Sequence, residues 1–238
     1  MDDRDPFSTL RFPSAARPLL GLTVLLVEDS RFASEAVRLL CMRSGARIRR
    51  ADCLRSARRH LQVYRPSVLM VDMGLPDGPG TELIAEAHAT MPRIGLIMGI
   101  SADDAARGRC LAAGADGFLA KPLHSLAYFQ TEILKHMPPD RQPVGPLILQ
   151  NETVLPDTVA YRDDIAHVAE LLDAGADHVV LDYVTQCLDG VARLAGDHVL
   201  LDANAALRHA RQSGHPLRSD LAHLAGLLQE RLTNRVAI

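Results

Sequence analysis

The sequence is poor in cysteine and has no long apolar run. The cysteines lie far apart with no pair at CxxC spacing, so neither a zinc cluster nor a disulfide framework is expected; they are Cys41, Cys53, Cys110 and Cys187. The longest apolar run, residues 19–27, is too short to span a bilayer. The N-terminus opens with acidic residues and lacks the pattern of a secretory signal. These absences predict a cytoplasmic protein with no membrane partner.

A large net charge is also missing, since 26 Lys and Arg stand against 29 Asp and Glu, giving -3. No global field therefore draws the chain to nucleic acid or anionic lipid. The charge is unevenly spread: residues 139–238 hold eight Arg, no Lys and fourteen acids, or -6, and residues 1–138 carry +3. An acidic second half is repelled by phosphates, so a nucleic-acid partner is not expected.

The chain of 238 residues is long enough for two domains. Residues 1–20 carry three prolines without periodicity and are predicted to form a flexible tail. From Gly21 onward, short apolar runs alternate with helical patterns, which is typical of repeated βα units and a parallel sheet. The predicted strands are 22–27, 46–51, 67–71, 94–100 and 117–120. The predicted helices are 31–43, 54–64, 81–90, 103–113 and 125–137.

The second half has a different pattern. Four prolines within 138–146 predict a linker at 139–146 that holds no helix. Apolar stripes beyond it predict four helices in a small antiparallel bundle within 147–238, at 157–173, 177–195, 198–213 and 218–235. The acids of Asp177-His178 and Asp197-His198 are expected at helix starts. An alternative is a degenerate second α/β unit, because 178–181 and 198–201 are rich enough in β-branched and aliphatic residues to be strands.

Acidic side chains follow the first and third predicted strands. Glu28 and Asp29 end the first strand, and Asp72 ends the third. In a parallel sheet ordered 2-1-3-4-5 these strands are neighbours, so the three carboxylates should meet at the crevice where ligands bind. Such a cluster repels itself unless a cation is present, and carboxylate oxygens with water suit Mg²⁺. An acidic pair after a strand is otherwise a solvated loop or a helix cap.

Two further residues should face the same edge. Ser101 ends the fourth strand and Lys121 the fifth. A hydroxyl donor and an ammonium beside a metal-bound carboxylate form a pocket that complements a phosphoryl group. Ser101 could instead cap the next helix, and Lys121 could be a surface charge. For the site to be absent, however, the polar residues at all four strand ends would need such unrelated structural roles at the same time.

Glu28-Asp29, Asp72 with Pro76 and Gly80, Ser101-Ala102 and Phe118-Leu119-Ala120-Lys121-Pro122 resemble the signature of two-component response regulator receiver domains. The resemblance covers residues 21–138. It implies a flavodoxin-like (βα)5 fold. It also implies phosphorylation by a sensor histidine kinase or a histidine phosphotransfer protein.

The same resemblance assigns roles to individual residues. Asp72 would be the phosphoacceptor, and Mg²⁺ would be held by Glu28, Asp29, Asp72 and the backbone carbonyl of Gly74. Ser101 and Lys121 would contact the phosphoryl oxygens, and Phe118 would act with Ser101 as a switch, although it could be a core residue. Gly74 offers no side chain at a position that influences phosphate lifetime in the family. The protein would be no enzyme beyond catalysing its own phosphorylation and dephosphorylation.

The output of the second half is less determined. The leading interpretation is a helical module for partner docking or homodimerisation, controlled by phosphorylation. One alternative is a DNA-binding transcriptional regulator, since 221–227 faintly resembles part of a helix-turn-helix. Another is a phosphotransfer domain, but that family has Lys three and Gly four residues after its active histidine. No histidine here matches; the six are His167, His178, His198, His209, His215 and His223.

Overall fold

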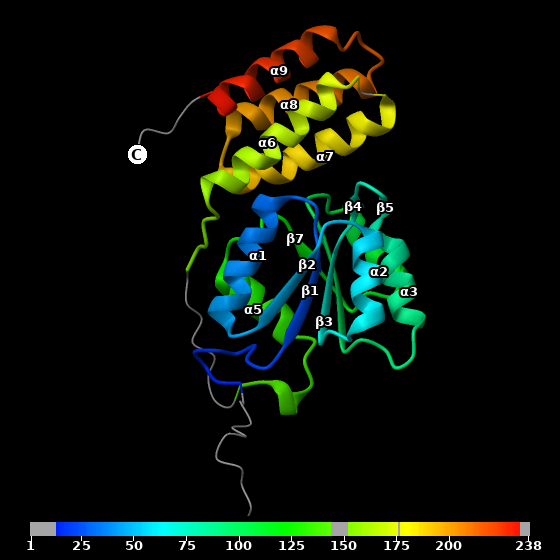
Figure 1. The fold of residues 1–238 in the computed structure, drawn as a ribbon, viewed down its shortest axis with the longest axis vertical. Helices are drawn as coiled ribbons and strands as arrows, with labels where there is room; N and C mark the ends of the chain where they lie inside the picture. The colour runs from blue at the N-terminus through cyan, green and yellow to red at the C-terminus, as the bar shows by residue number, and fades with distance from the viewer. Residues whose placement is uncertain (1–12, 144–151, 176, 234–238) are drawn as a thin grey trace, which may run out of the picture.

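The computed structural model describes residues 13–143, 152–175 and 177–233. They form an α/β domain and a helical bundle that sits at one end of its sheet (Figure 1). The first part of the predicted tail, the second part of the predicted linker and the last two residues of the final predicted helix lie outside the described residues. Within the described ranges, no helix combines the length and apolar character needed to cross a membrane.

The α/β domain is built on five parallel strands in the order β2-β1-β3-β6-β7, which confirms the predicted 2-1-3-4-5 order. The central strands are apolar and buried because helices cover both faces of the sheet. A short antiparallel pair that the sequence did not predict, β4 (Gly74–Leu75) with β5 (Gly78–Pro79), follows β3. The five strands are β1 (Thr23–Val27), β2 (Arg47–Ala51), β3 (Val68–Asp72), β6 (Leu96–Ser101) and β7 (Gly117–Ala120).

Helices follow the strands at nearly the predicted positions. Helices α1 and α5 lie on one face of the sheet, and α2 and α3 lie on the other (Figure 1). Ser30 caps α1 through its side chain, and Gly45 ends that helix with a φ of 85°, a conformation that glycine adopts without strain. The helices are α1 (Arg31–Ser44), α2 (Leu54–Val63), α3 (Gly80–Ala89), α4 (Ala106–Ala112) and α5 (Leu126–Leu134).

Two features at the edges of this domain correct the predictions. Residues 13–20 are not part of a tail: Leu19 is fully buried, and its N–H donates to the carbonyl of Ser44 at 2.9 Å. Burying this leucine outweighs the lack of a regular element around it. The proline-rich stretch also contains a 3-10 helix, Pro139–Arg141, which begins with a proline because that position needs no N–H donor.

The described part of the second half, residues 152–175 and 177–233, forms four helices close to the predicted bounds. Aspartate side chains cap three of them, Asp157 before α6, Asp177 before α7 and Asp197 before α8. The stretches 178–181 and 198–201 are helical as predicted, so the alternative of a second α/β unit is wrong. The helices are α6 (Thr158–Asp173), α7 (His178–Ala195), α8 (His198–Gln212) and α9 (Arg218–Thr233).

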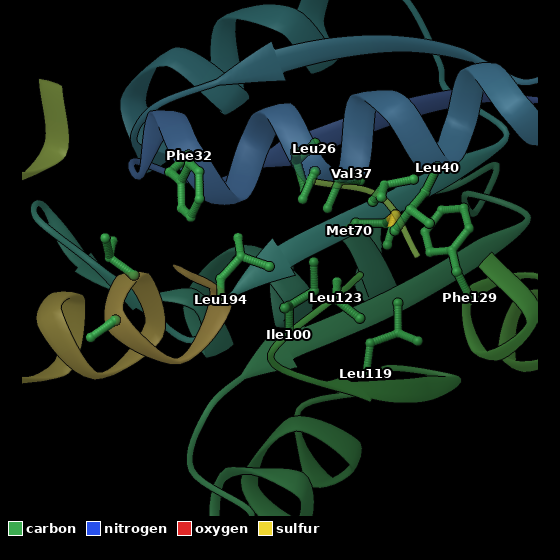
Figure 2. Packing of buried hydrophobic residues seen from close by; sticks show 14 of the residues in the cluster. Leu26, Phe32, Val37, Leu40, Met70, Ile100, Leu119, Leu123, Phe129 and Leu194 are labelled. Carbon is green, nitrogen blue, oxygen red and sulfur yellow. The ribbon is translucent and has the colours of Figure 1, made fainter. Parts of the chain in front are cut away.

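The bundle and the α/β domain share one apolar core. A single cluster of buried side chains runs from the sheet and α1 into α6, α7, α8 and α9. Figure 2 shows Leu194 of α7 near Phe32 of α1. The ring of Phe32 also meets that of Tyr161 of α6 edge-on, with centroids 5.5 Å apart. Apolar contact therefore fixes the bundle over the carboxyl ends of the strands.

Asp197 should contribute more to bundle stability than an ordinary helix cap. Besides the N–H of Leu200, its carboxylate accepts hydrogen bonds from Tyr161 and from Nε and Nη2 of Arg231. We expect Asp197→Ala to lower the free energy of unfolding by about 2 kcal/mol, against about 1 kcal/mol for the simple cap Asp177→Ala, in urea denaturation. Equal losses would contradict a special role for the Arg231 pair.

The same carboxylate predicts a pH dependence. The hydrogen bonds from Arg231 hold the pKa of Asp197 at about 2, below its usual 3.8. A lowered carboxyl pKa stabilises the folded state above the unfolded pKa, and this stabilisation is lost as pH falls from about 4 towards 2. Asp197→Ala should therefore remove part of the acid sensitivity of unfolding over that range.

Candidate functional site

Three carboxylates from two neighbouring strands meet at the carboxyl edge of the sheet. Glu28 and Asp29 follow β1 directly, and Asp72 is the last residue of β3, which pairs with β1. One oxygen of each carboxylate lies within 4.8 Å of the others. Glu28 is 1% exposed and Asp72 4% exposed. The predicted meeting of these acids is therefore observed, in a setting with little solvent to screen their charge.

A single ammonium group lies among these acids. Lys121 follows β7, and its Nζ is 2.8 Å from Oε2 of Glu28 and 2.8 Å from Oδ2 of Asp72. Burial alone would lower the pKa of Lys121, but the charges of Asp72 and Glu28 overcome that effect and raise it. The lysine therefore stays protonated and offsets one of three neighbouring negative charges.

Burial and the neighbouring negative charges shift the pKa values of two of the acids. Burial raises the pKa of Glu28 well above its usual range, and the nearby carboxylates add to this while Lys121 opposes it. Burial and then the charge of Asp72 raise the pKa of Asp29. Both shifts mean that full ionisation of the cluster is unfavourable in the protein alone, which is the electrostatic condition that a bound cation relieves.

The other predicted residues lie around this cluster. The N–H of Gly74 is 3.4 Å from Oδ1 of Asp72. Ser101 is buried, and its Oγ accepts a hydrogen bond from the N–H of Asp103 at 3.1 Å. Phe118 is 2% exposed in the core on the α2–α3 side, with the guanidinium of Arg107 over its ring. In this structure the proposed switch residue is thus turned inward.

Helix α7 of the bundle covers the acids. The cavity at Glu28, Asp29, Asp72 and Lys121 has a volume of about 20 Å³, room for about one water molecule. Its outer wall consists of residues spaced to share one face of α7, namely Gln186, Cys187, Gly190 and Val191. Ser101 does not line this cavity but an adjoining one of about 540 Å³, and Gln186 lines both.

Polar contacts from the bundle reach the same edge of the sheet. The hydroxyl of Tyr183 on α7 donates a hydrogen bond to Asp29. Burial and then the charge of Asp29 raise the pKa of this phenol, so it remains the donor. Asp164 of α6 is buried and accepts hydrogen bonds from Oγ of Ser30 and from the N–H groups of Arg31 and Phe32 at the start of α1. The bundle thus contacts the acids directly and caps a helix of the α/β domain.

The sequence did not predict that α7 covers the acids of the receiver domain. The helix predicted at 177–195 carries an apolar stripe that includes Tyr183, Cys187 and Val191, and this stripe predicts burial inside the bundle. A usable signal was present: α7 carries buried residues over a wide arc, including Val184, Leu188 and Ala192, and has a glycine at 190 in its middle. A helix that is apolar over so wide an arc needs a second packing partner.

One protein-family model matches the chain, and the match lies within the α/β domain. The family described as response regulator receiver domain matches residues 24–130, which include all the predicted site residues. This segment is a receiver domain. The acids, Lys121 and Ser101 therefore lie within the segment that matches this receiver-domain family.

Curated relatives match over less than half of this chain. The chain is 28% identical over 99 residues to the KDP operon transcriptional regulatory protein KdpE of Escherichia coli K12, covering 42% of this chain and 44% of KdpE. It is 35% identical over 108 residues to the transcriptional regulatory protein CitB of Klebsiella pneumoniae, covering 44% and 46%. The matched part thus spans less than half the length of these relatives.

Solved structures align over the same part of the chain. The receiver domain of sensor histidine kinase PA1611 of Pseudomonas aeruginosa PAO1, crystallised with a magnesium ion in its active-site cleft, is 25% identical with a TM-score of 0.41. It covers 48% of this chain and 93% of its own. The chemotaxis protein CheY4 of Vibrio cholerae is 21% identical with a TM-score of 0.45, covering 49% and 98%.

The residues of this receiver domain fit a divalent cation. Three carboxylate oxygens lie close enough to share one ion, and oxygen is the donor that Mg²⁺ prefers. Two of the three acids have raised pKa values that a cation would lower. Glu28, Asp29 and Asp72 are therefore the side chains that would hold Mg²⁺, while the ligand role predicted for the carbonyl of Gly74 stays a prediction.

Proposed function

We propose that the protein is a response regulator in which Asp72 accepts a phosphoryl group from a histidine kinase or a histidine phosphotransfer protein. The main support for this proposal is that Asp72 lies beside two further acids and Lys121 at one edge of the receiver domain. The protein acts on no separate substrate. It catalyses its own phosphorylation and dephosphorylation.

The chain's own residues supply most of the chemistry. An oxygen of ionised Asp72 attacks the phosphorus atom, forming an acyl phosphate as the bond from phosphorus to the donor's nitrogen breaks. Lys121 offsets charge on the phosphoryl oxygens, and the hydroxyl of Ser101 approaches them as a hydrogen-bond donor. Bound Mg²⁺ would neutralise further charge there.

Phosphorylation has to change the contact between α7 and the receiver domain. A phosphoryl group brings phosphorus and three oxygens, and the cavity of about 20 Å³ has room for about one water molecule. The shared apolar core around Phe32 and Leu194 holds the bundle nearby. We therefore propose that α7 withdraws from the acids without full separation of the bundle, and that the altered bundle face docks a protein partner or a second copy of the chain.

The alternative outputs receive less support. The stretch 221–227, where a helix-turn-helix was considered, lies inside the continuous helix α9. The relatives named as transcriptional regulators match over less than half of this chain. Among the described residues, no histidine lines the cavity that contains Asp72, so a phosphotransfer role for the bundle has no donor group in place.

Hydrogen exchange with beryllofluoride, a stable mimic of the phosphoryl group, tests the coupling. We expect the full chain with Mg²⁺ and beryllofluoride to lose amide protection in α7, at residues 183–191, while α9 keeps its protection because it packs mainly on α6 and α8. Asp72→Asn is the matched control, since it should show no change. Binding of beryllofluoride with unchanged protection in α7 would refute the coupling.

A further inference from the structure

Gln186 stands between the acid cavity and solvent. It lines the small cavity with Asp72 and also the adjoining larger one, whose receiver side includes Ser101 and Ala102. The residue is exposed, whereas its helix neighbours Thr185 and Leu188 are buried. Its side chain can therefore meet both the phosphoacceptor and bulk water.

The carboxamide of Gln186 takes the place of a side chain at Gly74. A Cβ built on Gly74 would lie 2.0 Å from Nε2 and 2.6 Å from Oε1 of Gln186. Any other residue at 74 would displace this carboxamide. The carboxamide therefore lies beside Gly74, whose N–H approaches Oδ1 of Asp72.

This carboxamide is free to bind water. Among the described residues it has no hydrogen-bond partner, and it offers an acceptor and two donors without a titratable charge. A group of this kind can hold one water molecule in line for attack on phosphorus, as glutamine does in GTP-hydrolysing enzymes. The larger cavity provides the path by which water arrives.

We propose that Gln186 orients the water molecule that hydrolyses the aspartyl phosphate at Asp72, so that the bundle shortens the lifetime of the phosphorylated state. The water oxygen forms a bond to phosphorus as the bond from phosphorus to the Asp72 oxygen breaks. The electron pair returns to the Asp72 carboxylate, and the water proton leaves with inorganic phosphate or passes to solvent. This inference rests on the proposed phosphorylation of Asp72.

The apolar core makes this action compatible with withdrawal of α7. Phe32, Tyr161 and Leu194 keep the bundle beside the receiver domain while the phosphoryl group occupies the cavity. The flexible Gln186 side chain can then still reach the phosphorus from the solvent side. Once phosphate leaves, α7 returns to the acids, and hydrolysis resets the docked state.

The lifetime of the phosphorylated full chain tests the proposal. The protein is labelled with radioactive acetyl phosphate and Mg²⁺, the donor is removed, and loss of label is followed over time. We expect Gln186→Ala to lengthen the half-life about tenfold, the effect of losing one hydrogen bond to the reacting water. The matched control, Gln229→Ala, removes an exposed glutamine of α9 and should decay as the wild type does.

A second variant tests the position of the carboxamide. Gly74→Ala places a methyl group where the carboxamide lies, so it should also slow decay. The double variant should decay no more slowly than Gln186→Ala, because both changes remove the same interaction. If the double variant instead decays more slowly than either single variant, the Gly74→Ala change acts directly at Asp72 and not by displacing Gln186. That result would overturn the proposal that both changes remove one interaction.

The outcomes separate this inference from the proposed function. No label on the wild type at the outset would refute phosphorylation of the chain. Normal labelling with wild-type decay in Gln186→Ala would overturn the role of Gln186 alone. Slower decay accompanied by lost exchange protection of α7 in the unphosphorylated variant would also overturn it, because Gln186 would then act only by docking the bundle.

Discussion

An Asp72→Asn variant will incorporate no phosphoryl group from acetyl phosphate or from a cognate histidine donor. The carboxamide that replaces the carboxylate is a poor nucleophile, and it removes one of the three acidic groups that would hold Mg²⁺. The measurement is radioactive labelling of the full chain, with hydroxylamine treatment to identify an acyl phosphate. We expect labelling to fall to background.

The control for this variant is Asp104→Asn, which removes an exposed acid near the site that is not among the clustered carboxylates. It should be labelled as the wild type is. Undiminished, hydroxylamine-sensitive labelling of Asp72→Asn would mean that another carboxylate accepts the phosphoryl group. The assignment of Asp72 would then fail even though the fold remains.

Replacement of Lys121 by methionine should have the largest effect on stability. The change leaves Glu28 and Asp72 buried without the ammonium that contacts both at 2.8 Å. Removing one partner of a buried ion pair costs about 3–5 kcal/mol. We expect a loss of this order near neutral pH in urea denaturation without Mg²⁺. Addition of Mg²⁺ should recover part of it, since a cation would offset the same charges.

The loss in Lys121→Met should depend on pH in a defined direction. Burial already raises the pKa of Glu28, and Lys121 opposes that rise. Without the lysine, the folded state holds a proton on Glu28 more tightly than the unfolded state does. Stability should therefore fall as pH rises above about 4.5, the unfolded pKa, and the defect should be smallest in mild acid.

The other lysine of the chain provides the control. Lys135 is exposed and pairs with Glu132 one helical turn away. An exposed pair of this kind contributes about 0.5 kcal/mol or less, so Lys135→Met should change stability little at any pH. Similar losses in the two variants would contradict the claim that burial among the acids determines the effect at Lys121.

Local sequence patterns predicted the receiver domain well because its signals are strong. The apolar runs that become β1, β3 and β6 are bounded by polar residues, and the acids stand at strand ends, where the topology of a parallel sheet brings them together. The capping aspartates at 177 and 197 likewise marked helix starts that the structure has. Where the signal was weak, as at Leu19, the prediction of a tail was wrong.

The sequence determined the helical character of the second half through local periodicity, and its resemblance to receiver domains implied the sheet order that brings Glu28, Asp29 and Asp72 together. Only the tertiary structure shows that α7 covers those acids and that the side chain of Gln186 packs against Gly74. Packing between helices and a distant sheet edge depends on the shapes of whole surfaces. The wide apolar arc of α7 indicates a second packing partner, but no local pattern in a single sequence identifies which surface that partner is.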